Sequence, residues 1–317
     1  MTTLRLPMPL DVTLPFWFDR PAGEAIDIAM NAEAAGADEL WVGEMTTWDG
    51  AALAAAIART TSKVTIVLGP LAVKVRDAVS LAMAVSSVAA LGNRPAHLAI
   101  GASSPVVVEQ WHGRPYDRMG TAVIECFEQL RPMLAGGRGP GGYRLRLDPP
   151  GGGLRIAVFG PRLTRYAAQH ADGVVLNMST PEQVVPYRRM LDEAAAEAGG
   201  PRPVLATWMM AGIDPGPRSF QQAATQLVAY LHPPGYGEKM IEAGVQMGMT
   251  RRDELNHPDL EGIGYYSHTI HKGRRVSSAK AFLHPVRRRR NLTVVTEALV
   301  DRVVFTDKQA KIGRAHV

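Results

Sequence analysis

Short apolar runs alternate with longer, alanine-rich or amphipathic stretches through the first 245 residues of the chain. The apolar runs predict strands at 11–16, 39–44, 64–70, 97–102, 154–160, 173–178 and 204–213. The stretches between them predict helices at 21–36, 76–91, 118–134, 161–170, 181–198 and 217–231, and one that begins at Asp49, a favourable N-cap residue. Strands that are apolar on both faces and alternate with helices indicate a parallel α/β sheet.

Seven such strand–helix units occur, and their periodicity does not distinguish a doubly wound sheet from a (β/α)8 barrel. In both folds, ligands bind at the carboxyl ends of the strands. The candidates for a binding site are therefore the residues that directly follow the strands, at 44–49, 69–70, 101–104, 160–162 and 177–180.

The turn Gly160-Pro161-Arg162 is the most informative of these segments. Glycine permits close approach of the backbone, and proline suits the first helical turn. The N–H groups at the start of the new helix, with Arg162 and Arg165 nearby, would suit a phosphate. An ordinary strand-to-helix turn explains the same residues, so both interpretations stay open. The glycine-rich stretch 136–142 lacks the Gly-Lys-Ser/Thr ending of a phosphate-binding P-loop.

Five segments resemble the luciferase-like monooxygenase superfamily, and within it the branch of deazaflavin (F420)-dependent oxidoreductases. They are ELWVGEMTTWDG, VTIVLGPLAV, HLAIGASSPVVVEQWHGRPYDR, VFGPRLTRYAAQHADGVVLN and YLHPPGYGE. The resemblance covers about residues 8–243 in the family's order. It implies a TIM-type (β/α)8 barrel that binds F420, or FMN in sister branches, at its carboxyl face. The implied reaction is hydride transfer to or from the deazaflavin.

The same resemblance implies a set of cofactor-binding residues. Glu44 and Trp48 would line the ring pocket, and Asn177 would face it. Gly69-Pro70 falls near a non-prolyl cis peptide bond that supports the ring in the family. The residues implied near the ring or the phosphate are Gly101, Ala102, Ser103, Gly160, Pro161 and Arg162.

The sequence departs from the family pattern where a proton donor would be expected. The sugar-phosphate dehydrogenase branch has a histidine and a glutamate where this chain has Met45 and Ser103 or Ser104. Glu109 and His112 are the nearest titratable residues and hence the weak catalytic candidates, although surface or structural roles are more common for such residues. The protein mainly positions the cofactor in hydride transfer, so a site without an evident acid or base remains compatible with an oxidoreductase.

Composition fits an ordinary globular protein, with 46% hydrophobic and 21% charged residues. There is no apolar run of about 18 residues, and the first residues lack the pattern of a signal peptide. Cys126 is the one cysteine and has no disulfide partner, and no residue spacing is typical of a metal site. We expect a cytoplasmic protein with a small-molecule substrate, without a metal or a membrane partner; a homo-oligomer stays open.

The final 72 residues differ sharply from the rest in charge. Residues 246–317 contain 14 Lys and Arg against 7 Asp and Glu, whereas residues 1–245 contain 21 against 23. The run EGIGYYSHTIHKGRRVSSAKAFLHPVRRRRNLTVVTEALVDRVVF resembles an internal piece of the glucose–methanol–choline oxidoreductases, over about 250–310. The FAD-binding GxGxxG loop of that family is absent, so we do not expect FAD to bind. The segment LTVVTEALVDRVVF predicts a strand pair.

The last seven residues, KIGRAHV, resemble the translation of a sequencing-library adapter. We therefore expect an incomplete barrel domain at 1–243, a glucose–methanol–choline-like fragment at 244–310 and an adapter-derived tail at 311–317, with a genuine fusion as the alternative. The run Arg287–Arg290 could bind nucleic acid, but a solvated loop explains it better, and no nucleic acid is expected as a partner.

A barrel without its eighth strand–helix unit would expose two sheet edges. We therefore expect poor solubility or weak cofactor binding. The leading function is that of an F420-dependent oxidoreductase. The alternatives are an FMN-dependent monooxygenase on the same barrel, an inactive chimera of two gene fragments, and a nucleic-acid binder that acts through the basic tail.

Overall fold

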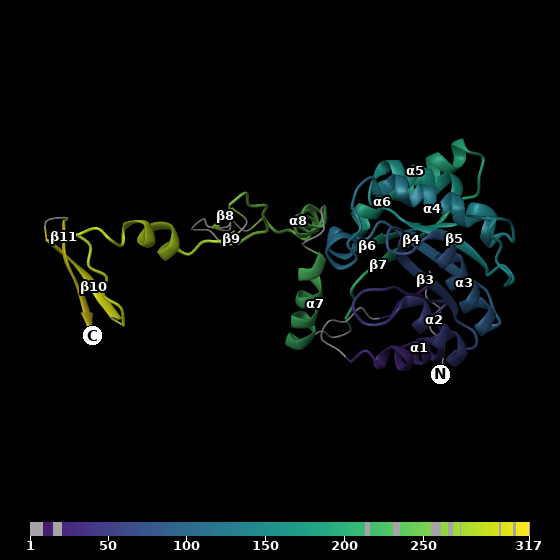
Figure 1. Cartoon of the computed structure of the whole chain (residues 1–317), viewed down its shortest axis with the longest axis horizontal. Coiled ribbons are helices and arrows are strands. Elements are labelled where there is room, and N and C mark those ends of the chain that lie inside the picture. Colours follow the sequence, from purple (N-terminus) through teal and green to yellow (C-terminus); the bar gives the residue numbers. More distant parts are fainter. Residues whose placement is uncertain are drawn as a thin grey trace. The chain divides into compact units, whose positions relative to one another are not determined.

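The computed structural model describes residues 9–14, 21–212, 216–230, 235–254, 261–265, 269–272, 274–297, 299–306 and 309–316. The chain divides into two compact units, Met1–Gly248 and Met249–Val317 (Figure 1). The first unit contains the alternating strands and helices, and it carries every candidate site residue named above.

Seven parallel strands form one sheet in the first unit, and each strand pairs with the next one along the chain. The strands are β1 (Val12–Thr13), β2 (Glu39–Val42), β3 (Thr65–Ala72), β4 (Ala96–Gly101), β5 (Gly151–Ala157), β6 (Gly173–Asn177) and β7 (Val204–Trp208). The sheet curves into a nearly closed barrel. Among the described residues, no strand pairs with the outer edge of β1 or of β7. The predicted TIM-type barrel without its eighth strand–helix unit is thus confirmed.

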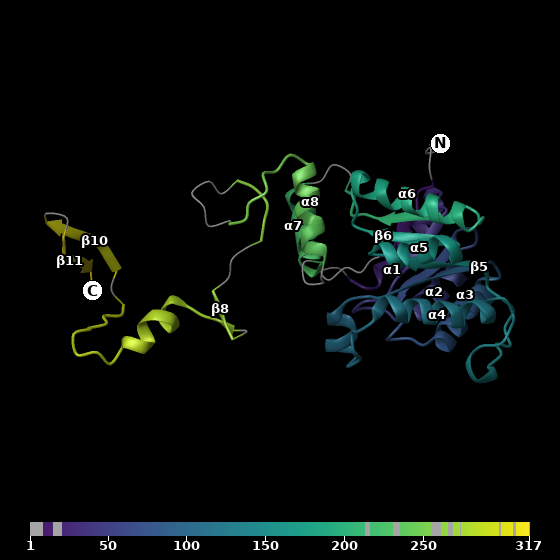
Figure 2. The ribbon, with the colours of Figure 1, turned by 90° about the horizontal axis from the view of Figure 1, so that it is seen from above.

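The helices connect the strands and cover the outside of the barrel, as Figure 1 shows for α2, α3 and α4. Figure 2 shows α5 and α6 next to each other beside β6. The helices are α1 (Glu24–Ala35), α2 (Gly50–Thr60), α3 (Ala78–Gly92), α4 (Met119–Leu134), α5 (Pro161–His170), α6 (Pro181–Glu197), α7 (Pro217–Tyr230) and α8 (Tyr236–Gln246). All seven predicted strand–helix pairs are present. The predicted element ends at 15–16, 213 and 231 lie outside the described residues.

Side chains of the strands alternate between two apolar layers, which is why the strands read as apolar on both faces. Leu40, Leu68 and Leu98 belong to the larger cluster between the sheet and the helices. A second, smaller cluster inside the barrel consists of Trp41, Val67, Ala99 and Val175. Burial of both faces explains why the strand positions could be recognised from hydrophobicity.

A polar network lies inside the barrel at the amino ends of the strands. The Arg155 guanidinium donates hydrogen bonds to both carboxylate oxygens of Glu39, one of them at 2.6 Å. Arg155 also lies over the Trp41 ring, with its Cζ 5.2 Å from the ring centroid. His97 Nδ1 accepts the Gly153 N–H at 2.7 Å, and burial lowers the pKa of His97, with Arg155 adding to the effect. The network links β2, β4 and β5 beneath the apolar interior.

Side-chain caps fix the starts of several helices. The Asp49 carboxylate accepts the Ala52 N–H at 2.9 Å, which confirms the predicted cap of α2. Thr180 and Gln183 form a reciprocal capping box at the start of α6. These caps satisfy N–H groups that the helices themselves leave unpaired.

The second unit is rich in strands but has little interior. It contains the short pair β8 (Ile270–His271) and β9 (Arg274–Arg275), and the longer antiparallel pair β10 (Leu299–Thr306) and β11 (Gln309–His316). The predicted strand pair within 292–305 is wrong in part, because 292–297 contains no strand and β10 pairs with 309–316 instead. None of the residues in this unit whose exposure is described is buried, and Phe282 and Leu299 are among the most exposed apolar side chains. The alternating apolar residues at 292–297 predicted a strand that does not form, because they have no second layer to pack against.

Candidate functional site

Two buried glycines, Gly69 in β3 and Gly101 at the end of β4, lie where neighbouring strands leave little or no room for a Cβ atom. Gly69 has a positive φ of 119°, and a Cβ atom there would overlap the Ala99 carbonyl oxygen. A Cβ atom at Gly101 would lie 3.1 Å from the Ala157 methyl group. The Gly69–Pro70 peptide bond is cis. The predicted Gly69, Pro70 and Gly101 thus lie together where β3, β4 and β5 approach one another closely.

Glu44 follows β2, and its carboxylate is fully engaged by neighbouring loops. It accepts hydrogen bonds from the Gly50 N–H at 3.2 Å and from Arg76 Nε at 2.9 Å, with a further bond from Arg76 Nη2. Arg76 also pairs with Asp49. The hydrogen bonds to Glu44, together with those to Asp49, raise the pKa of Arg76 above its ordinary value although burial opposes this. Glu44 therefore joins the loops that follow β2 and β3, and its carboxylate oxygens already accept hydrogen bonds from both.

Trp48, predicted in the same pocket, lies at the exposed rim. Its indole N–H donates to the Ala22 carbonyl oxygen at 2.9 Å, which connects the loop after β2 to the start of α1. The side chain is 41% exposed.

The loop after β4 links two of the predicted residues, Ser103 and Glu109, through Tyr116. Ser103 has a positive φ of 60°, and its carbonyl oxygen accepts the Tyr116 hydroxyl at 3.0 Å. The Tyr116 N–H in turn donates to Glu109 Oε1 at 3.0 Å. His112 lies between Glu109 and Tyr116 in the chain, and both His112 and Glu109 are exposed. Glu109 thus holds this loop in place, and the geometry assigns neither Glu109 nor His112 a catalytic contact.

The turn Gly160-Pro161-Arg162 connects β5 to α5 and is open to solvent. Gly160 is extended and provides no side-chain cap, and nothing lies within 4 Å of the position that a Cβ atom would take there. Pro161 and Arg162 are exposed. The Thr164 hydroxyl and N–H both donate to the Gly160 carbonyl oxygen, at 2.8 and 3.1 Å. This open helix start retains the geometry that a phosphate requires.

Asn177 ends β6 and contacts a group of residues that the sequence did not single out. Its side-chain amide donates to the Tyr236 hydroxyl at 3.0 Å. Lys239 Nζ donates to the Asn177 carbonyl oxygen at 2.6 Å and to Ser179 Oγ at 2.7 Å. Burial lowers the pKa of Lys239 to about 8, and Glu242 opposes the shift. Helix α8 therefore places a half-buried ammonium at the predicted face of the barrel.

Arg76 and Lys239 contact predicted site residues, but the sequence analysis did not identify either of them. Arg76 stands a few residues beyond β3, and its charge is opposite to that of Glu44 and Asp49 after the adjacent strand. The sequence could have suggested this pairing, because opposite charges follow two adjacent strands. Lys239 left no such signal, because its partners lie about sixty positions earlier in the chain.

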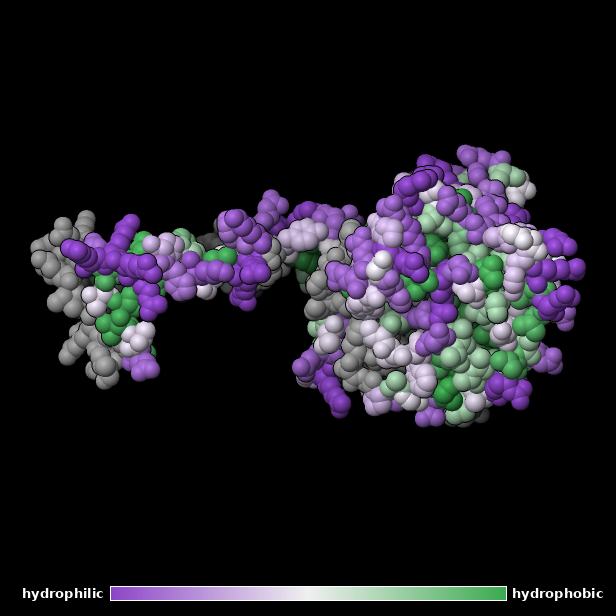
Figure 3. Space-filling view, viewed as in Figure 1, coloured by the Kyte–Doolittle hydropathy of each residue, from purple (hydrophilic) through white to green (hydrophobic). Residues whose placement is uncertain are grey.

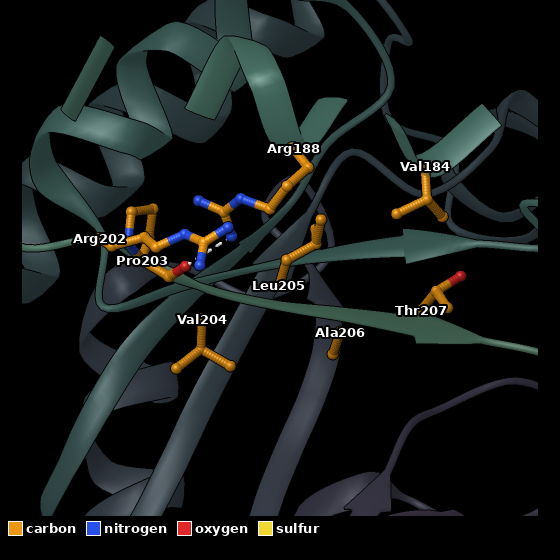
Figure 4. Close-up of a pocket in the computed structure, with 8 residues that line it drawn as sticks. All are labelled: Val184, Arg188, Arg202, Pro203, Val204, Leu205, Ala206 and Thr207. Carbon is orange, nitrogen blue, oxygen red and sulfur yellow. Dashed lines mark hydrogen bonds between the residues drawn. The ribbon is translucent and has the colours of Figure 1, made fainter. Parts of the chain in front are cut away.

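A groove of about 510 Å³ lies away from this face, between α6 and β7 (Figure 4). Arg188 lines it and donates to the Pro203 carbonyl oxygen at 3.0 Å. Arg188 Nε and Thr207 Oγ1 are buried there without hydrogen-bond partners. The groove follows the outer edge strand of the incomplete barrel, and none of the predicted site residues lines it.

The described ranges contain neither a candidate metal-binding cluster nor a helix that could span a membrane. No cluster of three or more His, Cys, Asp or Glu residues there could hold a metal ion. No helix there is long and apolar enough to span a membrane. Figure 3 shows polar and apolar side chains interspersed on the visible face of the first unit.

A family model described as luciferase-like monooxygenase matches residues 9–297. Among solved structures, the chain is similar to the coenzyme F420-dependent tetrahydromethanopterin reductase of Methanopyrus kandleri, with a TM-score of 0.63 and 17% identity, over 76% of this chain and 80% of that one. It is also similar to the FMN-bound oxygenating constituent of 3,6-diketocamphane monooxygenase from Pseudomonas putida. That TM-score is 0.54 at 17% identity, over 76% of this chain and 77% of the other.

A different similarity covers a smaller part of the chain. An oxygen-dependent choline dehydrogenase of Pectobacterium atrosepticum is 49% identical over 78 residues, which is 24% of this chain. The chain spans only 14% of the length of that relative. The resemblance to two unrelated families, expected from the residues, is confirmed.

Proposed function

Because the chain belongs to the luciferase-like monooxygenase family, whose members are flavin- or deazaflavin-dependent enzymes, we propose that its barrel is an F420-dependent oxidoreductase. The observation that carries the proposal is the open turn at Gly160, at the carboxyl end of a barrel strand. A helix start of this kind suits a phosphate, and ligands of this fold bind at the carboxyl ends of the strands.

The residues present fit a bound deazaflavin or flavin. The open position at Gly160 leaves room for a phosphate. Arg162 adds a positive charge at that helix start. When bound, the cofactor would supply hydride transfer, and the chain would supply binding and orientation.

Each contact described above has a defined part in this function. Arg76 and Glu44 fix the loops that follow β2 and β3, so this part of the carboxyl face is preformed. Tyr116 holds the loop after β4 through Ser103 and Glu109, and this loop would limit the access of water. Any proton that the reaction requires would come from a residue other than Glu44, whose carboxylate is occupied.

The test is a comparison of cofactor affinities on the full 317-residue chain. We expect F420 to bind at least about tenfold more tightly than FMN, although both bind weakly because the barrel is incomplete. Tighter binding of FMN would favour the FMN-dependent monooxygenase, which the similarity to an FMN-bound structure supports as the second candidate. If neither cofactor binds, the proposed function is wrong. Tight, stoichiometric F420 binding would contradict the expectation that the missing unit weakens the site.

A Gly160→Asp variant would separate phosphate recognition from ring recognition. A carboxylate at this open turn would repel a phosphate without displacing neighbouring atoms, because nothing lies within 4 Å of the Cβ position. We expect it to weaken binding of FMN but not of riboflavin, which has the same ring without the phosphate. Gly23→Asp, which places the same charge at the open start of α1, is the matched control and should change neither affinity.

A further inference from the structure

Lys239 carries a positive charge that the described residues do not neutralise with an ion pair. Its ammonium is half-buried, and two of its three hydrogen atoms are donated to neutral acceptors, the Asn177 carbonyl oxygen and Ser179 Oγ. Glu242 is the charged group that acts on it, but its carboxylate accepts a hydrogen bond from Gln183 Nε2 at 3.3 Å. The third N–H of Lys239 is therefore available to a ligand.

The surroundings of this ammonium are aromatic. Lys239 Nζ lies 5.8 Å from the Phe159 ring centroid and 6.0 Å from that of Tyr236, and the two rings are 5.2 Å apart. Phe159 is 46% exposed although it lies next to this partly desolvated cation. Gly235, with a φ of 88°, allows the close contact, because a Cβ atom there would overlap the Phe159 ring. The contact therefore holds an apolar surface and a cation side by side.

We propose that Lys239, positioned by Asn177 and Ser179, recognises an oxyanion, a phosphate or carboxylate, on a ligand whose apolar part lies against Phe159. Hydrogen bonds between an ammonium and an oxyanion are about twice as strong as bonds between neutral groups. Ser179 is 3% exposed, so the group that orients the ammonium is itself fixed. The lowered pKa of Lys239 fits a cation that lacks its counter-charge.

The oxyanion that Lys239 recognises can belong to either of two molecules. It is the phosphate of the cofactor or an anionic group of the substrate. The choice between these sources rests on the proposed function, whereas the oxyanion site itself does not. FMN and riboflavin differ in the phosphate and therefore test the first source. Inorganic phosphate, added to the full chain with and without FMN, tests the second.

The variants are Lys239→Met, which removes the charge, and Lys63→Met, which removes an exposed lysine before β3 as the matched control. If the oxyanion belongs to the cofactor, Lys239→Met weakens FMN binding about tenfold and leaves riboflavin binding unchanged. If it belongs to the substrate, both cofactor affinities stay the same. Inorganic phosphate then raises the Tm of the wild type and of Lys63→Met, but not of Lys239→Met.

The proposal is overturned if Lys239→Met binds FMN and inorganic phosphate as Lys63→Met does. Failure of the proposed function would look different, because neither cofactor would bind the wild type while the phosphate experiment would still report on Lys239.

A pH series on the wild type provides a test that does not depend on folding of the variant. Phosphate affinity should fall from pH 8 to 9.5 as the ammonium loses its proton, while inorganic phosphate stays a dianion. Glu242 and Tyr236 are the titratable groups that face Lys239. An unchanged affinity across this range would assign phosphate binding to an arginine instead.

Discussion

Arg155 and Glu39 form an ion pair inside the barrel, and replacing Arg155 by methionine would leave the Glu39 carboxylate without its counter-charge. The two side chains are 7% and 18% exposed. At an effective dielectric constant of about 20, two unit charges about 4 Å apart attract each other by about 4 kcal/mol. Removal of one partner from a buried pair costs about 3–5 kcal/mol. Methionine retains much of the side-chain volume, so the lost charge dominates, and the partial exposure of Glu39 places the expected loss near about 3 kcal/mol.

The assay is urea unfolding followed by tryptophan fluorescence, for which Trp41 beside Arg155 is a suitable reporter. Arg146→Met, at an exposed arginine, is the matched control and should change the free energy of unfolding by less than about 0.5 kcal/mol. The double variant Glu39→Gln with Arg155→Met removes both charges and should be more stable than the sum of the single changes predicts. The reasoning is refuted if Arg155→Met loses no more stability than Arg146→Met, or if the two changes are additive.

The loss should also depend on pH. His97 Nε2 lies 3.6 Å from Glu39 Oε1, and Arg155 contributes to the low pKa of His97. Without Arg155, His97 is protonated more readily and can neutralise Glu39 in its place. The difference in unfolding free energy between wild type and Arg155→Met should therefore be smaller at pH 5.5 than at pH 8. An equal difference at the two pH values would exclude this compensation.

Three further changes test other contacts. Asp49→Ala removes the α2 cap and a partner of Arg76, and should lower the free energy of urea unfolding by about 1–2 kcal/mol. Asp49→Asn keeps a capping oxygen, so its unfolding free energy should lie between those of wild type and Asp49→Ala. Gly69→Ala should cost more than about 1 kcal/mol because of its positive φ and the backbone overlap, whereas Gly160→Ala should be nearly neutral by the same measurement. Lys239 has a folded-state pKa of about 8 against its usual 10.5, so the unfolded chain binds more protons between these values. Wild type should therefore gain stability relative to Lys239→Met as the pH rises from 8 to 10.5, and a constant difference would contradict the lowered pKa.

The order of strands and helices could be predicted because the barrel buries both faces of its sheet. Leu40 and Trp41 illustrate this, since these neighbours belong to the outer and inner apolar layers and both are fully buried. The cap at Asp49 was also predictable, because an N-cap depends only on neighbouring residues. Patterns of this kind are local, and they do not depend on an eighth strand, which the described part of the sheet lacks.

The contacts at the candidate site could not be predicted in the same way. Glu44 was assigned to the ring pocket by resemblance, but its role in holding Arg76 depends on how the two loops meet. Lys239 reaches Asn177 and Ser179 only because α8 packs on the end of β6. The segment 292–297 shows the opposite case, because its alternating apolar residues have no layer to pack against and do not form a strand.

The consecutive order of the seven strands also has a consequence for how the chain folds. Each strand pairs with the next one in the sequence, and even the distant register partners Ala96 and Gly151 join successive strands. A complete barrel must also bring its first and last strands together, which requires closing a loop nearly as long as the domain, at an entropic cost that grows with loop length. No such pairing occurs among the described residues of this sheet. The pairings that remain are comparatively local, and local pairings favour rapid folding in which strands add one after another from either end of the sheet.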